Sequence, residues 1–117
     1  MRMNDHALQL LRDLSNAPGP SGFEDAVVQV ARQYAASIGE MKEDFLRNLY
    51  IYRKENTGNK PVLMLDAHSD EVGLIVHSIK PNGCLRFLQL GSWNKNALVS
   101  SKVLVPGVKR SSLPRMK

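Results

Sequence analysis

The chain has 117 residues, of which 43% are hydrophobic and 23% are charged, as is typical of a globular domain with a modest core. No apolar run approaches the roughly 20 residues of a membrane-spanning helix, and a single cysteine, Cys84, excludes an internal disulfide. The net charge of +5 is unevenly distributed, because all acidic residues lie at or before Glu71, which leaves a basic second half.

The first segment predicts a helix and no signal peptide. Asn4 or Asp5 can cap it, and Leu8, Leu11 and Leu14 form a helical stripe that extends to about Leu14. Residues 1–14 also carry acidic side chains and lack a small-residue cleavage site, so we expect a cytoplasmic location.

A second helix is predicted after the "APGPSG" break at residues 17–22. Ser21 and Glu24 have the spacing of a capping box, and Gly39 is expected to end the helix as a C-cap. The inner face is expected to consist of Phe23, Val27, Val30 or Ala31, Tyr34 and Ile38.

From residue 40 onward the apolar period is that of strands. Residues 41–45 and 48–54 predict two short strands, and 62–65 are apolar on both faces, which predicts a central strand covered by helices. Residues 72–79 and 85–90 predict two further strands joined at Asn82–Gly83, a strong hairpin signal, and 97–105 predict one more. Residues 106–117 have no apolar period and are expected to be disordered.

A histidine and an aspartate follow the predicted central strand, where α/β proteins commonly place ligands and catalytic groups. His68 could ligate a divalent metal ion, and Asp70 could accept a hydrogen bond from its other ring nitrogen and so orient it. The same spacing also suits an ordinary hydrogen-bonded loop.

Four nearby polar residues have open or minor roles. Asp66 could cap a turn or support the metal ligand, and Glu71 could be a charge at a sheet edge or a group beside the site. His77 is expected to be half-buried on a strand, and His6 is expected to be solvated near the first helix.

Three ordered segments give these patterns a family context: "SNAPGPSGFED", "LMLDAHSDEVGLIV" and "IKPNGCLRFLQLGSWNKNALVSSKVLV". Together they resemble the N-terminal part of the glutamyl and deblocking aminopeptidases, cytosolic metallo-exopeptidases that assemble into tetrahedral particles. The resemblance implies an α/β fold, with part of a zinc-peptidase-like α/β layer at 1–77. It also implies the beginning of an inserted β-barrel-like assembly domain at 78–105, followed by a basic tail at 106–117 that does not match the family.

The resemblance also implies a site with two divalent ions, zinc or cobalt, in which His68 is a ligand and Asp70 orients it. The implied partners are a peptide substrate and further copies of the chain, with no nucleic acid and no membrane. The family's remaining ligands and its general-base glutamate have no counterpart after Glu71. We therefore expect a truncated aminopeptidase that is inactive alone and binds at most one metal ion weakly.

Two alternatives remain open: a non-enzymatic interaction or oligomerisation fragment, and nucleic-acid binding through the basic half. The second has no recognised nucleic-acid motif to support it. A smaller departure concerns the predicted turn at Arg47–Asn48, where many relatives have glycine. Arg47 is expected to be costly there if the turn requires a positive φ.

Overall fold

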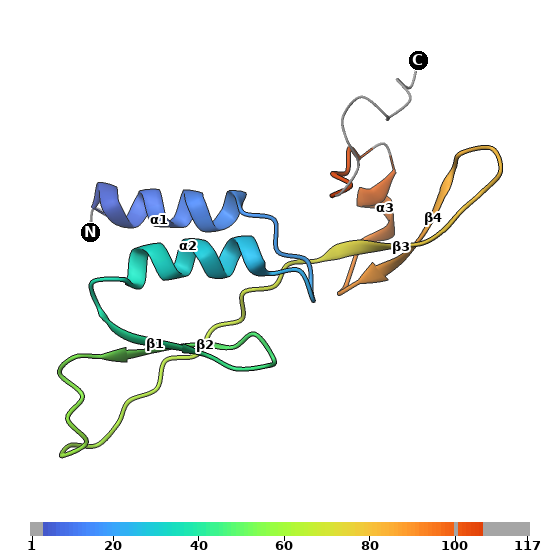
Figure 1. Ribbon diagram of the computed structural model, residues 1–117. Helices are drawn as coiled ribbons and strands as arrows, with labels where there is room; N and C mark the ends of the chain where they lie inside the picture. Colours follow the sequence, from blue (N-terminus) through green and yellow to red (C-terminus); the bar gives the residue numbers. More distant parts are fainter. Residues whose placement is uncertain (1–3, 100, 107–117) are drawn as a thin grey trace.

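In the computed structural model, which describes residues 4–99 and 101–106, two helices lie beside one β-hairpin and a second hairpin extends away from them (Figure 1). The elements in chain order are α1 (Asp5–Asn16), α2 (Asp25–Ala35), β1 (Gly39–Glu43), β2 (Leu49–Arg53), β3 (Gly73–Ile79), β4 (Leu85–Leu90) and α3 (Lys95–Leu98). Within the described ranges, no helix has the length and apolar character needed to cross a membrane. The architecture is mixed α/β with two separate antiparallel sheets, which confirms the predicted class.

The two long helices begin differently. The side chain of Asn4 accepts a hydrogen bond from the Ala7 N–H over 2.7 Å, so the predicted cap of α1 is confirmed. The capping box predicted for α2 is wrong, because Glu24 occupies the N-cap position and makes no side-chain cap bond. The Glu24 carboxylate instead accepts from the Gly22 N–H over 2.7 Å, and the hydroxyl of Ser21 has another partner, described below.

The buried part of the helical unit is small and centres on Val27, Val28 and Ala35 of α2. The predicted inner face is wrong at its two ends, since Phe23 is 64% exposed and Ile38 is 44% exposed. Both residues lie outside the helix, which begins at Asp25 and ends at Ala35, so neither shares the helical face that packs on α1.

The two predicted short strands are confirmed as an antiparallel pair, with Gly39 opposite Arg53 and Glu43 opposite Leu49. Gly39 is the first residue of β1 and not the predicted helix C-cap. A Cβ atom at this position would lie 1.7 Å from the carbonyl oxygen of Tyr52, so the close approach of the two strands requires glycine.

The turn between β1 and β2 places Arg47 in the left-handed region, with φ 71°. The N–H of Arg47 donates to the carbonyl of Asp44 over 3.1 Å, which closes the turn. The Asp44 carboxylate also accepts from the N–H groups of Leu46 and Asn48, each over 2.9 Å. The positive φ that would make arginine costly here is therefore confirmed.

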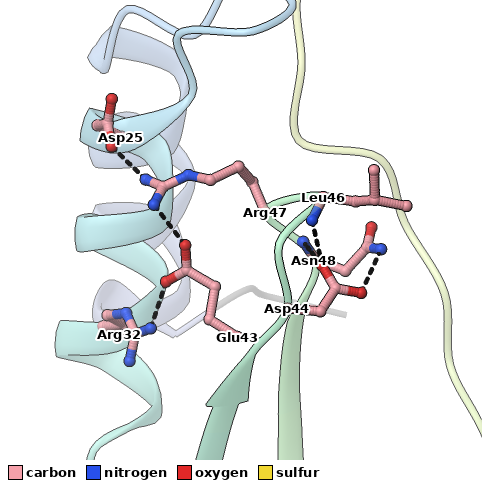
Figure 2. A network of polar contacts seen from close by, with 7 residues as sticks. All are labelled: Asp25, Arg32, Glu43, Asp44, Leu46, Arg47 and Asn48. Atoms are coloured by element: carbon pink, nitrogen blue, oxygen red, sulfur yellow. Dashed lines mark hydrogen bonds and ion pairs between the residues drawn. The ribbon is translucent and has the colours of Figure 1, made fainter.

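Arg47 and Arg32 connect this hairpin to α2 through a network of charged side chains (Figure 2). Arg47 forms ion pairs with Asp25 and, over 2.5 Å, with Glu43, and Arg32 contacts the other oxygen of Glu43 over 2.5 Å. The hydrogen bond from Arg32, assisted by the charge of Arg47, lowers the pKa of Glu43. The network holds the hairpin against the helical pair.

The prediction of a buried central strand at residues 62–65 is wrong for this structure. Val62, Leu63, Met64 and Leu65 are 71%, 83%, 77% and 88% exposed, and the segment belongs to neither sheet. A central strand needs a hydrogen-bonded neighbour on each side, and none of the described strands pairs with this segment.

The second hairpin is confirmed, with β3 and β4 joined by a turn in which Gly83 has φ 81°. The register shifts between Val76 and Ser78. The expected domain boundary at 78 lies inside β3, because this strand extends to Ile79. The strand predicted at 97–105 is wrong throughout its described residues: α3 includes residues 97 and 98, with the Asn94 side chain capping its first turn, and 99 and 101–105 belong to no strand. Except for Pro106, the predicted basic tail lies outside the described residues.

Candidate metal-ligand site

The candidate site lies on the segment that leads into β3, where His68 and Asp70 are in contact as predicted. His68 Nδ1 lies 3.0 Å from Asp70 Oδ1 and 3.1 Å from the Asp70 carbonyl oxygen. Because both neighbours are acceptors, the neutral imidazole is expected to place its proton on Nδ1, which leaves the lone pair on Nε2. The His68 side chain is 86% exposed, and its Nε2 has no hydrogen bond to the described residues.

A third side chain completes this hydrogen-bonded series. The hydroxyl of Ser21, from the loop between α1 and α2, donates to Asp70 Oδ2 over 2.5 Å. This hydrogen bond, together with the one from His68, lowers the pKa of Asp70. The carboxylate is therefore ionised at neutral pH and accepts on both oxygens.

The loop that carries Ser21, residues 17–22, is attached to the start of β3 by its backbone (Figure 1). The Glu71 N–H donates to the carbonyl of Gly19 over 2.8 Å, and the Gly19 N–H donates to Glu71 Oε1 over 2.9 Å. Pro20 and Glu71 form a parallel β-bridge, and a Cβ atom at Gly73 would lie 2.5 Å from Cβ of Pro20, so the loop runs alongside the start of β3 at van der Waals distance. Of the two roles left open for Glu71, the structure supports a group beside the site, where it holds this loop.

The other end of the site region is held by Trp93, whose indole N–H donates to the carbonyl of Gly73 over 2.8 Å. Trp93 follows β4 in sequence, so this bond returns the chain to the start of β3. The segment that carries His68 and Asp70 is thus fixed at 71–73 by one loop from the helical unit and one residue after the second hairpin.

The remaining residues singled out by sequence lie apart from this cluster. Asp66 is exposed and has no hydrogen bond or ion pair with residues in the described ranges. His77, predicted to be half-buried, is exposed on β3, because that hairpin has no covering layer in the described structure. His6 is exposed as predicted, and its ring contacts the edge of Tyr34 at a centroid distance of 5.2 Å.

The donor chemistry suits a single metal ligand. A neutral imidazole with Nδ1 hydrogen-bonded to a carboxylate is the arrangement commonly found for histidine ligands of zinc, and it leaves Nε2 as the donor atom. Among residues 4–99 and 101–106 there is no group of three or more histidine, cysteine, aspartate or glutamate residues that could hold an ion. The described residues therefore fit one ligand and its orienting carboxylate.

Sequence reasoning missed Ser21 as part of this cluster. Its spacing from Glu24 indicated a helix cap, while its actual partner lies 49 residues away in the chain. The signal that could have found it is the position of a hydroxyl residue between Pro20 and Gly22, in a loop that cannot continue either helix.

Comparison with known proteins identifies the relationship. A family model described as M42 glutamyl aminopeptidase matches residues 48–113, more than half of the chain. The glutamyl aminopeptidase of Lactococcus lactis subsp. cremoris is 34% identical over 85 residues, which are 72% of this chain and 24% of that protein. The lysyl aminopeptidase of Pyrococcus furiosus is 32% identical over 100 residues, which are 81% of this chain and 27% of that protein.

A solved structure agrees with these sequence matches. The TET aminopeptidase of a marine sediment Thaumarchaeota archaeon superposes with a TM-score of 0.69 at 37% identity, covering 76% of this chain and 24% of that one. The chain thus spans about a quarter of the length of the proteins that it matches.

Proposed function

The chain belongs to the M42 glutamyl aminopeptidase family, and on this basis we propose that it forms the N-terminal part of a metal-dependent aminopeptidase catalytic domain. In this proposal His68 binds a divalent ion, zinc or cobalt, through Nε2, and Asp70 orients the imidazole. The observation that carries the proposal is the 3.0 Å contact between His68 Nδ1 and Asp70 Oδ1, which leaves the other ring nitrogen available.

The reaction class follows from the family and from the chemistry of such ions. A bound divalent ion supplies a Lewis acid that polarises a peptide carbonyl and lowers the pKa of water. The residues described here contribute ligand binding and orientation, since they contain one imidazole donor with its carboxylate and no further cluster of ligands. We therefore propose that these 117 residues alone bind metal weakly and do not hydrolyse peptides.

The second hairpin has a separate proposed role. We propose that residues 78–105 begin a β-domain inserted into the catalytic domain and that the full-length protein forms a homo-oligomer. The strands β3 and β4 form a sheet separate from that of β1 and β2, which supports a distinct β-unit that already includes β3 from Gly73, and the likeness to a TET aminopeptidase supports assembly.

Metal binding can be tested directly with the chain labelled with ¹⁵N-histidine and titrated with Co²⁺, whose paramagnetism broadens the ring signals of nearby histidines. The signals of His68 should broaden at a lower Co²⁺ concentration than those of His6 and His77, which have no carboxylate partner among the described residues. His68→Ala should abolish this first phase, and His77→Ala should leave it unchanged. First binding at another histidine, or binding that survives His68→Ala, would contradict the proposed ligand.

The proposed inactivity has its own test. The chain, loaded with zinc or cobalt, is incubated with peptides that carry a glutamyl or lysyl N-terminus, and released amino acid is measured. No release above the metal-only blank is expected, because the described residues provide one ligand where catalytic zinc sites generally have three. Release that disappears in His68→Ala would show that these residues are catalytically sufficient.

A further inference from the structure

We propose that Ser21 is a positioning residue for the candidate metal ligand: its hydroxyl holds the Asp70 carboxylate in the orientation that keeps the His68 proton on Nδ1. The inference rests on the proposed function, because it concerns which nitrogen His68 offers to a metal ion. It assigns a role to the loop between α1 and α2, which contributes no ligand itself.

Two hydrogen bonds connect the three side chains in series. Ser21 Oγ donates to Asp70 Oδ2 over 2.5 Å, and Asp70 Oδ1 accepts from His68 Nδ1 over 3.0 Å. Asp70 is 42% exposed, so one contact with a mobile surface imidazole would leave its carboxylate free to rotate. The bond from Ser21 occupies the second oxygen and leaves Oδ1 for the imidazole.

The donor is itself held in place. Gly19 is buried, and it exchanges two hydrogen bonds with Glu71, the residue that follows Asp70. The carbonyl of Pro20 accepts from the N–H of Phe23 over 2.8 Å, which fixes the turn that contains Ser21. The hydroxyl is therefore delivered to Asp70 by backbone contacts on both sides and not by chance rotation of an exposed side chain.

The serine also forgoes the partner that its sequence position offers. Its spacing from Glu24 is that of a helix capping box, yet α2 has no side-chain cap bond. The helix begins at Asp25 with Glu24 as its N-cap, so Ser21 lies before the cap position and its hydroxyl is available to the ionised carboxylate, a strong acceptor. The helix start is left without its usual cap, and the carboxylate beside His68 gains a donor.

The consequence for His68 is a choice of tautomer. A neutral imidazole distributes its proton between the two ring nitrogens, and the nitrogen that holds the proton cannot bind a metal ion. A carboxylate fixed at Nδ1 favours the tautomer that leaves Nε2 free. The carbonyl of Asp70, 3.1 Å from Nδ1, could favour the same tautomer without Ser21, and the experiment separates these two explanations.

The test measures the tautomer of His68 in the metal-free 117-residue chain labelled with ¹⁵N-histidine, at about pH 8.5, where an imidazole is neutral. The ¹⁵N chemical shifts of the ring give the ratio of the Nδ1–H to the Nε2–H form. Ser21→Ala should lower this ratio by about fivefold, the effect of one hydrogen bond of ordinary net strength. Ser21→Thr, which keeps the hydroxyl, should restore it.

A matched control is Ser69→Ala, which removes a hydroxyl next to His68 that makes no hydrogen bond in the described structure and should leave the ratio unchanged. The amide signals of Gly19 and Glu71 report whether the loop is still attached. If Ser21→Ala detaches it, Ser21→Cys decides the matter, because the thiol has nearly the same shape but is a weaker donor. The ratio must fall in Ser21→Cys while those amide signals stay in place.

The outcomes distinguish this inference from the proposed function. An unchanged ratio in Ser21→Ala, or in Ser21→Cys with the loop attached, would overturn the role of Ser21 and show that the two acceptors of Asp70 fix the tautomer without it. If the ratio falls, the apparent dissociation constant for Co²⁺ should rise in inverse proportion to the measured Nδ1–H fraction. Failure of His68 to bind Co²⁺ in the unmodified chain would refute the proposed function, while the tautomer ratio would still decide the role of Ser21.

Discussion

Replacing Arg47 with glycine and with alanine separates the backbone requirement of the β1–β2 turn from its ion pairs. Arg47 has φ 71°, a conformation that costs a residue with a Cβ atom about 1–2 kcal/mol relative to glycine. Both substitutions remove the guanidinium group that contacts Asp25 and Glu43, so the loss of those ion pairs cancels when the two variants are compared.

The remaining difference in hairpin stability between Arg47→Gly and Arg47→Ala can be given a magnitude. Glycine makes the unfolded chain more flexible than alanine does, which offsets about 0.4–1 kcal/mol of the relief. The glycine variant should therefore hold the hairpin closed more firmly than the alanine variant by a net of about 1 kcal/mol. This corresponds to roughly a fivefold difference in the equilibrium constant for opening.

Native-state hydrogen exchange provides the assay, because it reports the opening of one hairpin without requiring the whole chain to unfold together. The ladder amides of β1 and β2 should exchange about fivefold more slowly in Arg47→Gly than in Arg47→Ala. The amides of β3 and β4 serve as an internal control and should exchange equally in both variants. Equal rates in β1 and β2 would show that the turn does not impose the left-handed conformation on residue 47.

Three further substitutions test other contacts. The pKa of Asp44 is lowered mainly by a hydrogen bond from the Asn48 side chain. The contribution of this carboxylate to hairpin stability should therefore be complete above the unfolded pKa near 3.9 and should disappear as the pH falls through the lower folded pKa. Circular dichroism from about pH 5 to 2 should show this loss of stability, and Asp44→Ala should remove that part of the pH dependence; a pH dependence unchanged in Asp44→Ala would show that another group causes it. Gly73→Ala places a Cβ atom 2.5 Å from Cβ of Pro20 and should destabilise the contact between loop 17–22 and β3 by about 1–3 kcal/mol. The amides at the start of β3 should then exchange faster, and unchanged exchange would mean that the loop and the strand are not in contact. Trp93→Phe keeps an aromatic ring but loses the 2.8 Å hydrogen bond to the carbonyl of Gly73, so the free energy of unfolding of β3–β4 should fall by about 1 kcal/mol. Urea unfolding should show this as a lower midpoint concentration, and an unchanged midpoint would contradict a stabilising role for Trp93.

Features decided by a few neighbouring residues were predictable from the sequence. The Asn4 cap depends on a side chain and an N–H group three residues apart, and the structure has that bond at 2.7 Å. The turn at Asn82–Gly83 depends on the ease with which glycine adopts a positive φ, and Gly83 has φ 81°. At Arg47 the same rule identified a conformation that the residue type does not favour.

Features that depend on a distant partner were not predictable. The apolar run at 62–65 records a preference for burial, but a strand also requires neighbours, and the described strands do not pair with it. Ser21 had two possible partners, a helix N–H nearby and the Asp70 carboxylate 49 residues away, and only the first was visible in the sequence. At the candidate site, the contact of His68 with Asp70 followed from their spacing, whereas the donor that holds Asp70 did not.

The contacts around His68 indicate from which side further metal ligands could reach the candidate site. The backbone at 71–73 is restrained by loop 17–22 on one side and by Trp93 on the other, so the loop that carries His68 does not depend on a metal ion for its position. The imidazole itself is 86% exposed, and within the described part of the chain it is held only through Nδ1. In the proposed site, an ion would therefore meet an oriented nitrogen on an open surface, and further ligands would have to approach from that exposed side. A substitution that disturbs the loop, such as Gly73→Ala, should then weaken metal binding at His68 even though it touches neither His68 nor Asp70.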